Sequence, residues 1–217
     1  MLLPCSLKNK DMRHFALTLA VLAAIAGCIQ TGNDGFSKKE LELIRGPQDS
    51  IMRVLTVEDS LDNAVLRSIS SDMSASALLS EEYEILCKRM TATVTHPSQD
   101  GVGIAGPQVG LNRRIVAVQR FDKAGFPFEV YPNIRIVWAS DSLSYGSEGC
   151  LSVPGRRGEV LRSREIIIEY ADMEALKDRL EDKEAIPVKR DTVSGFTAVI
   201  FQHETDHLDG ILYIDRL

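Results

Sequence analysis

The sequence predicts an α+β fold in which antiparallel or mixed β-sheets surround one helix near the C-terminus. Three observations along the 217-residue chain lead to this prediction. A run with helical spacing of apolar residues comes first, several runs rich in β-branched and aromatic residues follow, and one long run without helix breakers comes near the end. Because strands and helices do not alternate, a parallel sheet built from βαβ units is not expected.

The first helix is expected at residues 76–94 (SALLSEEYEILCKRMTATV). Apolar side chains recur there at intervals of three and four, and Ser80 and Glu81 suit the first turn of a helix. The apolar positions are Leu79, Tyr83, Leu86, Cys87 and Met90. This spacing predicts an amphipathic helix that turns one face toward the core.

Four segments in the middle of the chain are predicted as strands because they are β-branched or aromatic and are bounded by Gly, Pro, Asn or Asp. They are residues 115–119, 128–131, 134–138 and 166–170. The last helix is expected at residues 195–208 (GFTAVIFQHETDHL), with Asp209-Gly210 as its stop signal.

The composition is that of a globular protein with one sizeable core, since 44% of the residues are hydrophobic and 26% are charged. The net charge of −6 offers no basic stripe, so we expect no nucleic-acid partner. Four cysteines (Cys5, Cys28, Cys87 and Cys150) do not make a disulfide framework, although a Cys87–Cys150 bridge is conceivable in an oxidising compartment.

The N-terminus resembles the signal of a bacterial lipoprotein. Residues 15–26 (FALTLAVLAAIA) are too short to span a bilayer but suit a signal-peptide core, and Arg13 and His14 precede them. Ile25-Ala26-Gly27-Cys28 resembles a lipobox, in which the sulfur of Cys28 carries a lipid. We therefore expect a signal peptide at 1–27, a polar tether at 28–49 and the folded, catalytic domain at 50–217.

An acylated Cys28 would anchor the protein to a membrane, where it would face the periplasm or the cell surface. Two alternatives stay open. The apolar run is also compatible with a core helix. Met12 offers a second start codon, and a mis-assigned N-terminus would return the protein to the cytoplasm.

An H-E-x-x-H motif lies inside the expected last helix, at His203-Glu204-Thr205-Asp206-His207. Residues four apart lie on one helix face, so both imidazoles can reach one metal ion. Glu204, next to the first ligand, is better placed to take a proton from water than to bind the ion. The alternative is a chance match on a surface helix.

A catalytic metal usually has a third protein ligand. In one class of zinc proteases it is a His six residues after the second helix His, but that position is Tyr213 here. The third ligand is therefore expected upstream, and His96 and Cys150 are the candidates.

Three motifs in order resemble the peptide deformylase family. Residues 101–108 (GVGIAGPQ) match G-x-G-x-A-x-x-Q, residues 148–152 (EGCLS) match E-G-C-L-S, and residues 203–207 match H-E-x-D-H. Flanking stretches from about Met52 to the end of the chain are also similar to the family. The resemblance implies the deformylase fold, with sheets around a central metal-binding helix.

The resemblance also implies the metal site and the reaction. Cys150, His203 and His207 would hold one divalent ion, Fe(II) as is typical of the family, with Zn, Ni or Co also suited to a thiolate and two imidazoles. Glu204 would act as the general base in removing the formyl group from N-formylmethionyl peptides, which releases formate. The Gln108 side chain and the Leu151 N–H would donate to the oxyanion.

Further roles are expected around this site. Val102, Gly103 and Gly149 would lie along the substrate backbone, because glycine allows close approach. Val199 and Ile200 would line a slot for the methionine side chain, or serve simply as core residues. Behind the ligands, Glu148 and Arg162 would pair, and Asp206 would orient an imidazole or a backbone group.

Two departures from the family are evident: its usual C-terminal extension does not follow Leu217, and a lipobox is at odds with a cytoplasmic deformylase. Exported formyl peptides, or another amide, would then be the substrates. Two rival functions remain, a metallo-endopeptidase that uses the H-E-x-x-H motif and a non-catalytic lipoprotein that retains the fold.

Overall fold

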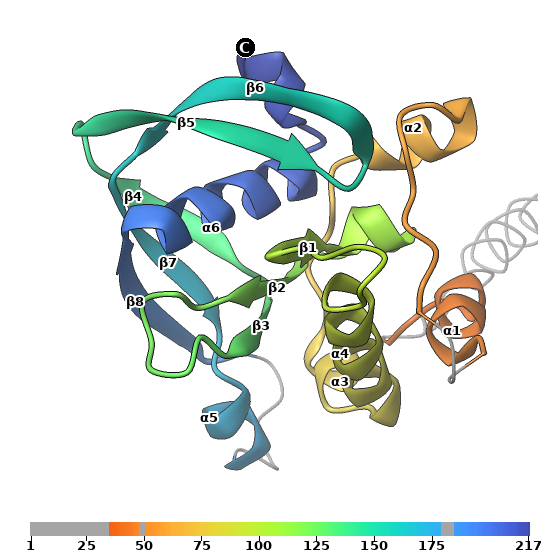
Figure 1. Cartoon of the computed structure of the whole chain (residues 1–217). Helices are drawn as coiled ribbons and strands as arrows, with labels where there is room; N and C mark the ends of the chain where they lie inside the picture. Colours follow the sequence, from red (N-terminus) through yellow and green to blue (C-terminus); the bar gives the residue numbers. More distant parts are fainter. Residues whose placement is uncertain (1–34, 48–50, 179–184) are drawn as a thin grey trace, which may run out of the picture. The chain divides into compact units, whose positions relative to one another are not determined.

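The computed structural model describes residues 35–47, 51–178 and 185–217. The expected signal peptide, including Cys28, lies outside the described residues. Within the described ranges, no helix is long and apolar enough to cross a membrane. Gly35–Leu217 form one compact unit (Figure 1).

The first helices are short and begin at side-chain caps. They are α1 (Lys38–Arg45), α2 (Ser60–Leu66), α3 (Ala75–Leu78) and α4 (Glu81–Val94). The single helix expected at 76–94 is wrong in one respect, because the chain breaks at Leu79-Ser80. The Ser80 hydroxyl accepts a hydrogen bond from Tyr83 N–H and donates one to Ala77 C=O, so it ends α3 and starts α4.

Helix α1 lies inside the segment that was expected to be a polar tether. Ser37 and Glu40 cap its first turn reciprocally. Ile44 is fully buried, and the Arg89 guanidinium on α4 donates to the carbonyls of Leu43 (2.8 Å) and Ile44 (2.9 Å). The tether expectation is therefore corrected for these residues, and the folded unit begins at Gly35 instead of residue 50.

In the described part of the chain, eight strands form three antiparallel groups (Figure 1). β1 (Gly103–Ala105), β2 (Ile115–Gln119) and β3 (Phe128–Pro132) make the first sheet, in that order. β4 (Arg135–Ala139), β7 (Glu165–Ala171) and β8 (Val188–Ser194) make the second. β5 (Leu143–Cys150) and β6 (Val153–Ser163) form a long hairpin.

The four predicted strands are confirmed within one or two residues at their ends, as β2, β3, β4 and β7. Four further strands, β1, β5, β6 and β8, were not predicted from the sequence. Most of the missed strands are rich in Gly, Ser and charged residues, and their partner strands hold them in place.

Helix α6 (Gly195–Leu208) has the predicted bounds and packs between the β5–β6 hairpin and the two three-stranded sheets (Figure 1). Most of its residues are buried, and more than half of these are polar, among them Glu204 and His207. Gly210 at φ +71° follows the cap residue Asp209 and turns the chain away from the helix. The remaining elements are α5 (Met173–Asp178) and the 3-10 turns η1 (Gly106–Val109) and η2 (Tyr213–Arg216).

Candidate metal centre

The last two turns of α6 present two imidazoles on one face. The rings of His203 and His207 lie 5.1 Å apart between centroids, as expected for residues four apart on a helix. The neighbouring hairpin supplies a sulfur to the same place, because the Sγ of Cys150 lies 3.2 Å from Nε2 of His207. The ligand atoms of the three residues all lie within 4.8 Å of one another.

The structure selects Cys150 as the third ligand. The pairing of β5 with β6 shifts register between Gly149 and Cys150, and this irregularity comes directly before the Leu151-Ser152 turn. His96, the other candidate, is exposed, and its Nδ1 bonds to the Ser98 hydroxyl. Tyr213 is stacked on the His203 ring instead of offering a ligand atom.

The donor set suits a divalent transition metal such as Fe(II) or Zn(II). Nδ1 of His203 bonds to Oε2 of Glu148 at 2.8 Å, which leaves Nε2 for a metal. Burial, and then the positive charges of His203 and Arg162, lower the pKa of His207 well below its ordinary value. Burial therefore favours the neutral form of His207, which is the form that binds a metal, and a metal bound at His203 would displace the proton of that ring.

Glu204 is buried beside the three ligands. Its Oε2 has no hydrogen-bond partner among the described residues, and burial raises the pKa of Glu204 to about 7 against the opposing effect of His203. A carboxylate in this state is suited to exchange a proton near neutral pH.

Gly103 makes room for this carboxylate. A Cβ on Gly103 would lie 2.5 Å from Oε1 of Glu204 and 2.8 Å from Cγ2 of Ile200. The close approach at Gly103 within the chain is that of the Glu204 side chain, and a place for Gly103 along the substrate backbone stays a prediction. The contact also places β1 directly against the ligand-bearing turn of α6.

Gln108 lies on η1 and is buried next to the sulfur of Cys150. Its Oε1 accepts a hydrogen bond from Ala105 N–H at 2.8 Å, which fixes the orientation of the amide. Nε2 consequently points to the Ser152 hydroxyl at 3.3 Å and to the Cys150 sulfur at 3.6 Å. Gln108 therefore presents an N–H donor within the site.

The turn after Cys150 carries Leu151 and Ser152. Leu151 is half-buried there, and the Ser152 N–H donates to the Cys150 sulfur at 3.4 Å. Ser152 was missed as a site residue, although it belongs to the E-G-C-L-S motif. Its hydroxyl holds Gln108, and its amide stabilises negative charge on the sulfur.

The residues expected to bind substrate differ in how far they are buried. Ile200 is buried against Gly103, and Val199 and Val102 are half-buried, with the Val102 carbonyl accepting from Gln119 N–H. Gly149 is exposed and pairs in register with Arg157 across the hairpin.

A Cβ on Gly149 would meet only ordinary contacts, beginning at 3.5 Å. Close approach within the chain thus explains the glycine at 103 but not the glycine at 149.

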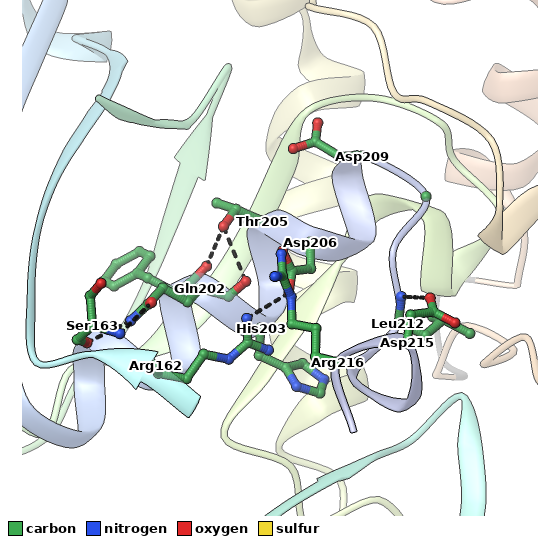
Figure 2. Close-up of polar contacts among 12 residues, drawn as sticks. Arg162, Ser163, Gln202, His203, Thr205, Asp206, Asp209, Leu212, Asp215 and Arg216 are labelled. Carbon is green, nitrogen blue, oxygen red and sulfur yellow. Dashed lines mark hydrogen bonds and ion pairs between the residues drawn. The ribbon is translucent and has the colours of Figure 1, made fainter. Parts of the chain in front are cut away.

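Behind the ligands, Glu148 and Arg162 form a two-point ion pair of 2.8 and 3.0 Å. Burial raises the pKa of Glu148, but the hydrogen bonds from His203 and Arg162 outweigh burial and lower it to about 2. The expectation for Asp206 is corrected, because its carboxylate binds the guanidinium groups of Arg162 and Arg216 instead of an imidazole (Figure 2).

Two more residues were missed. Gln202 joins α6 to the end of β6 through Ser163, accepting from its N–H at 3.0 Å and donating to its carbonyl at 2.9 Å (Figure 2). Arg216 approaches from the C-terminal turn. Nothing local in the sequence marks either residue, since both depend on contacts between distant segments.

Comparisons with known proteins agree with this geometry. Residues 51–217 match the family model "Polypeptide deformylase". A peptide deformylase of Leptospira biflexa serovar Patoc is 35% identical over 164 residues, which cover 72% of this chain and 84% of that protein.

Solved structures are similar as well. The class I type b peptide deformylase from Acinetobacter baumannii with Met-Ala-Ser bound is 30% identical, with a TM-score of 0.64 over 77% of this chain and 99% of that one. The peptide deformylase from Thermotoga maritima is 28% identical, with a TM-score of 0.63 over 77% and 98% of the two chains.

The family match at residues 51–217 includes the hairpin cysteine Cys150 and the two helix histidines. The chain belongs to the peptide deformylase family and is a metallohydrolase that removes the N-formyl group from peptides.

Proposed function

We propose that this chain deformylates N-formylmethionyl peptides with Glu204 as its proton carrier. The observation that carries the proposal is the buried Glu204 carboxylate, with a pKa raised to about 7, beside the Cys150, His203 and His207 ligand atoms. These atoms would hold a divalent ion, and Fe(II) is typical of the family. The ion would supply Lewis acidity that activates water and polarises the formyl oxygen.

Glu204 would take the proton of the attacking water on its carboxylate and later pass it to the departing amine nitrogen. A carboxylate with a pKa near the working pH can perform both steps, because neither protonation state is strongly favoured. Burial against Gly103 and Ile200 holds the carboxylate in place and limits access of bulk water.

Gln108 and Leu151 would stabilise the oxyanion that develops on the formyl group. The Gln108 amide is held by Ala105 so that Nε2 is the donor on the site side. The backbone N–H of Leu151, next to Cys150, would be the second donor. Donors of this kind contribute roughly 2–4 kcal/mol each to transition-state stabilisation.

The substrate's first side chain would contact Val199 and Ile200 beside His203, with Val102 and Gly149 along its backbone. The Acinetobacter baumannii enzyme with Met-Ala-Ser bound supports a peptide that begins with methionine.

The test is formate release from formyl-Met-Ala-Ser by the full chain, purified without oxygen and loaded with ferrous iron. We expect formate to be released while the Met–Ala and Ala–Ser peptide bonds stay intact. Cleavage of an unformylated peptide would instead favour the metallo-endopeptidase, and a folded, metal-loaded protein that releases no formate would favour a non-catalytic role.

We also propose that Cys28 is lipidated and that the enzyme works at a membrane on exported formyl peptides. The short apolar run followed by Ile25-Ala26-Gly27-Cys28 supports this location. Labelled fatty acid should attach to the parent chain in a bacterial host and not to Cys28→Ser. An unlabelled, freely soluble parent would place the enzyme in the cytoplasm.

A further inference from the structure

A line of alternating charges runs from the ligand His203 to the C-terminal turn, and Figure 2 shows its last part, from Arg162 through Asp206 to Arg216. It starts with the 2.8 Å bond between His203 and Glu148 and continues through the two-point pair of Glu148 with Arg162. Nη1 of Arg162 then donates to Asp206 at 2.6 Å. Both oxygens of Asp206 accept from Arg216, at 2.5 Å each.

Arg216 completes the charge balance of this line. The side chains of Glu148, Arg162 and Asp206 are 6%, 4% and 11% exposed, whereas that of Arg216 is 41% exposed. Without Arg216, two buried carboxylates would share one guanidinium. Asp206 would then attract Arg162 more strongly, and the pair that holds Glu148 against His203 would loosen.

The turn that carries Arg216 is fixed by two further contacts. The ring of Tyr213 stacks on the ring of His203, with centroids 6.0 Å apart and planes 22° apart. Asp215 forms an ion pair with Arg67, which lies at the C-terminal end of α2 and makes no bond to Glu148, Arg162 or Asp206. The turn is thus held both by the charge line and by an independent ion pair.

We propose that Arg216 is a positioning residue for the metal ligand His203, acting through Asp206, Arg162 and Glu148. Partners of this kind fix the tautomer and the ring orientation of a ligand histidine, and their loss weakens metal binding by about 10- to 100-fold. The C-terminal turn thereby determines how firmly the site retains its metal. The proposal rests on the metal site and does not depend on which peptide is the substrate.

The test measures metal retention in the full chain loaded with Co(II). The rate of cobalt loss to excess EDTA and the visible absorption band of the bound cobalt are followed in the parent, Arg216→Ala, Arg216→Lys and Arg67→Ala. Arg67→Ala is the matched control, because it removes the other ion pair of the same turn and leaves the charge line intact.

Arg216→Ala should lose cobalt about tenfold faster than the parent and shift the absorption band, whereas Arg67→Ala should stay within about twofold of the parent. Arg216→Lys retains the charge but not the two-point geometry, so an intermediate rate is expected. Equal rates for Arg216→Ala and Arg67→Ala, or a parental rate for Arg216→Ala, would overturn the proposal.

If Arg216→Ala does not fold, Arg216→Lys decides the question. Cobalt loss faster than that of Arg67→Ala would support the positioning role, and a rate equal to that of the parent would contradict it. The rate of cobalt loss and the absorption band are measured without formate release. A failure of the positioning role is therefore distinguishable from a failure of the proposed deformylation.

Discussion

Two buried arginines contact the same helix, α6, and each is surrounded by acidic side chains. Arg162 binds Glu148 and Asp206 beside the metal ligands. Arg120 binds Asp122 and Asp191 near Phe201 of the same helix. Both regions are built from arginine–carboxylate ion pairs. Arg162 is connected through Glu148 to the ligand His203, whereas the guanidinium of Arg120 lies 5.7 Å from the centre of the Phe201 ring.

The partners differ in their access to water. The side chains of Asp122 and Asp191 are 28% and 33% exposed, several times more than Glu148 and Asp206. Water can therefore replace much of what Arg120 provides but little of what Arg162 provides. Burial of the carboxylate partners, more than burial of the arginine, therefore determines how much such a cluster contributes to stability and function.

Replacing Arg162 by Met should have the largest effect. The buried carboxylates of Glu148 and Asp206 would lose the positive charge that they share. The free energy of unfolding should fall by about 3–5 kcal/mol as a result. Metal should also be lost at least about tenfold faster, because Glu148 would no longer be held against His203. Urea denaturation and metal loss to a chelator measure the two effects, and unchanged metal retention would contradict the account.

Replacing Arg120 by Met should cost less, roughly 2 kcal/mol, because its carboxylate partners can be hydrated. Metal retention and formate release per folded molecule should stay at the parental level. Measured beside Arg162→Met, this variant separates stability from function. A metal-loss rate that rises as much as in Arg162→Met would show that both clusters act on the site.

Gly103→Ala perturbs the part of α6 next to the metal ligands through a steric contact and leaves its charges unchanged. The new Cβ would meet Oε1 of Glu204 at 2.5 Å, so the carboxylate or β1 must shift, at about 1.5 kcal/mol. Displacement of the Glu204 carboxylate should also reduce formate release by about tenfold, which corresponds to about 1.4 kcal/mol of transition-state stabilisation. Gly146→Ala on β5 is the matched control, since no atom lies within 4 Å of its added Cβ.

The smallest effect is expected at a third arginine–carboxylate pair, Arg113 with Glu40 on α1. Burial raises the pKa of Glu40, but hydrogen bonds from Arg113 and the Ser37 cap outweigh it and lower the pKa from 4.5 to about 2. The pair therefore stabilises the fold above pH 4.5, and this contribution is lost as the pH falls toward 2.

Because Glu40 is partly solvated, the contribution is discounted to about 1 kcal/mol. Urea midpoints between pH 6 and 3 should fall less steeply in Glu40→Gln than in the parent. Parallel curves would show that α1 contributes nothing through this pair.

Local sequence was enough to predict the central helix α6 and the two histidine ligands on it. The run from Gly195 to Leu208 has no breaker, and the four-residue spacing of His203 and His207 is itself a helical property. The same holds for β2, where a β-branched run is buried on both faces.

Residue spacing could not choose between His96 and Cys150, because the choice depends on pairing of β5 with β6 far from α6 in sequence. Only the family motif pointed to Cys150. Arg216 had no signal at all, since its role exists only when the last turn meets Asp206. By contrast, Ser37 and Glu40 form a capping box three residues apart, a local signal of α1 that the polar composition obscured.

Deformylation by this chain depends most on Glu204 as the proton carrier, and Glu204→Gln tests this role directly. The variant keeps the size of the side chain and does not touch Cys150, His203 or His207. Formate release from formyl-Met-Ala-Ser should fall by about 10²- to 10⁴-fold while the metal content per chain stays that of the parent. A metal-loaded Glu204→Gln that keeps most of its activity would contradict the account.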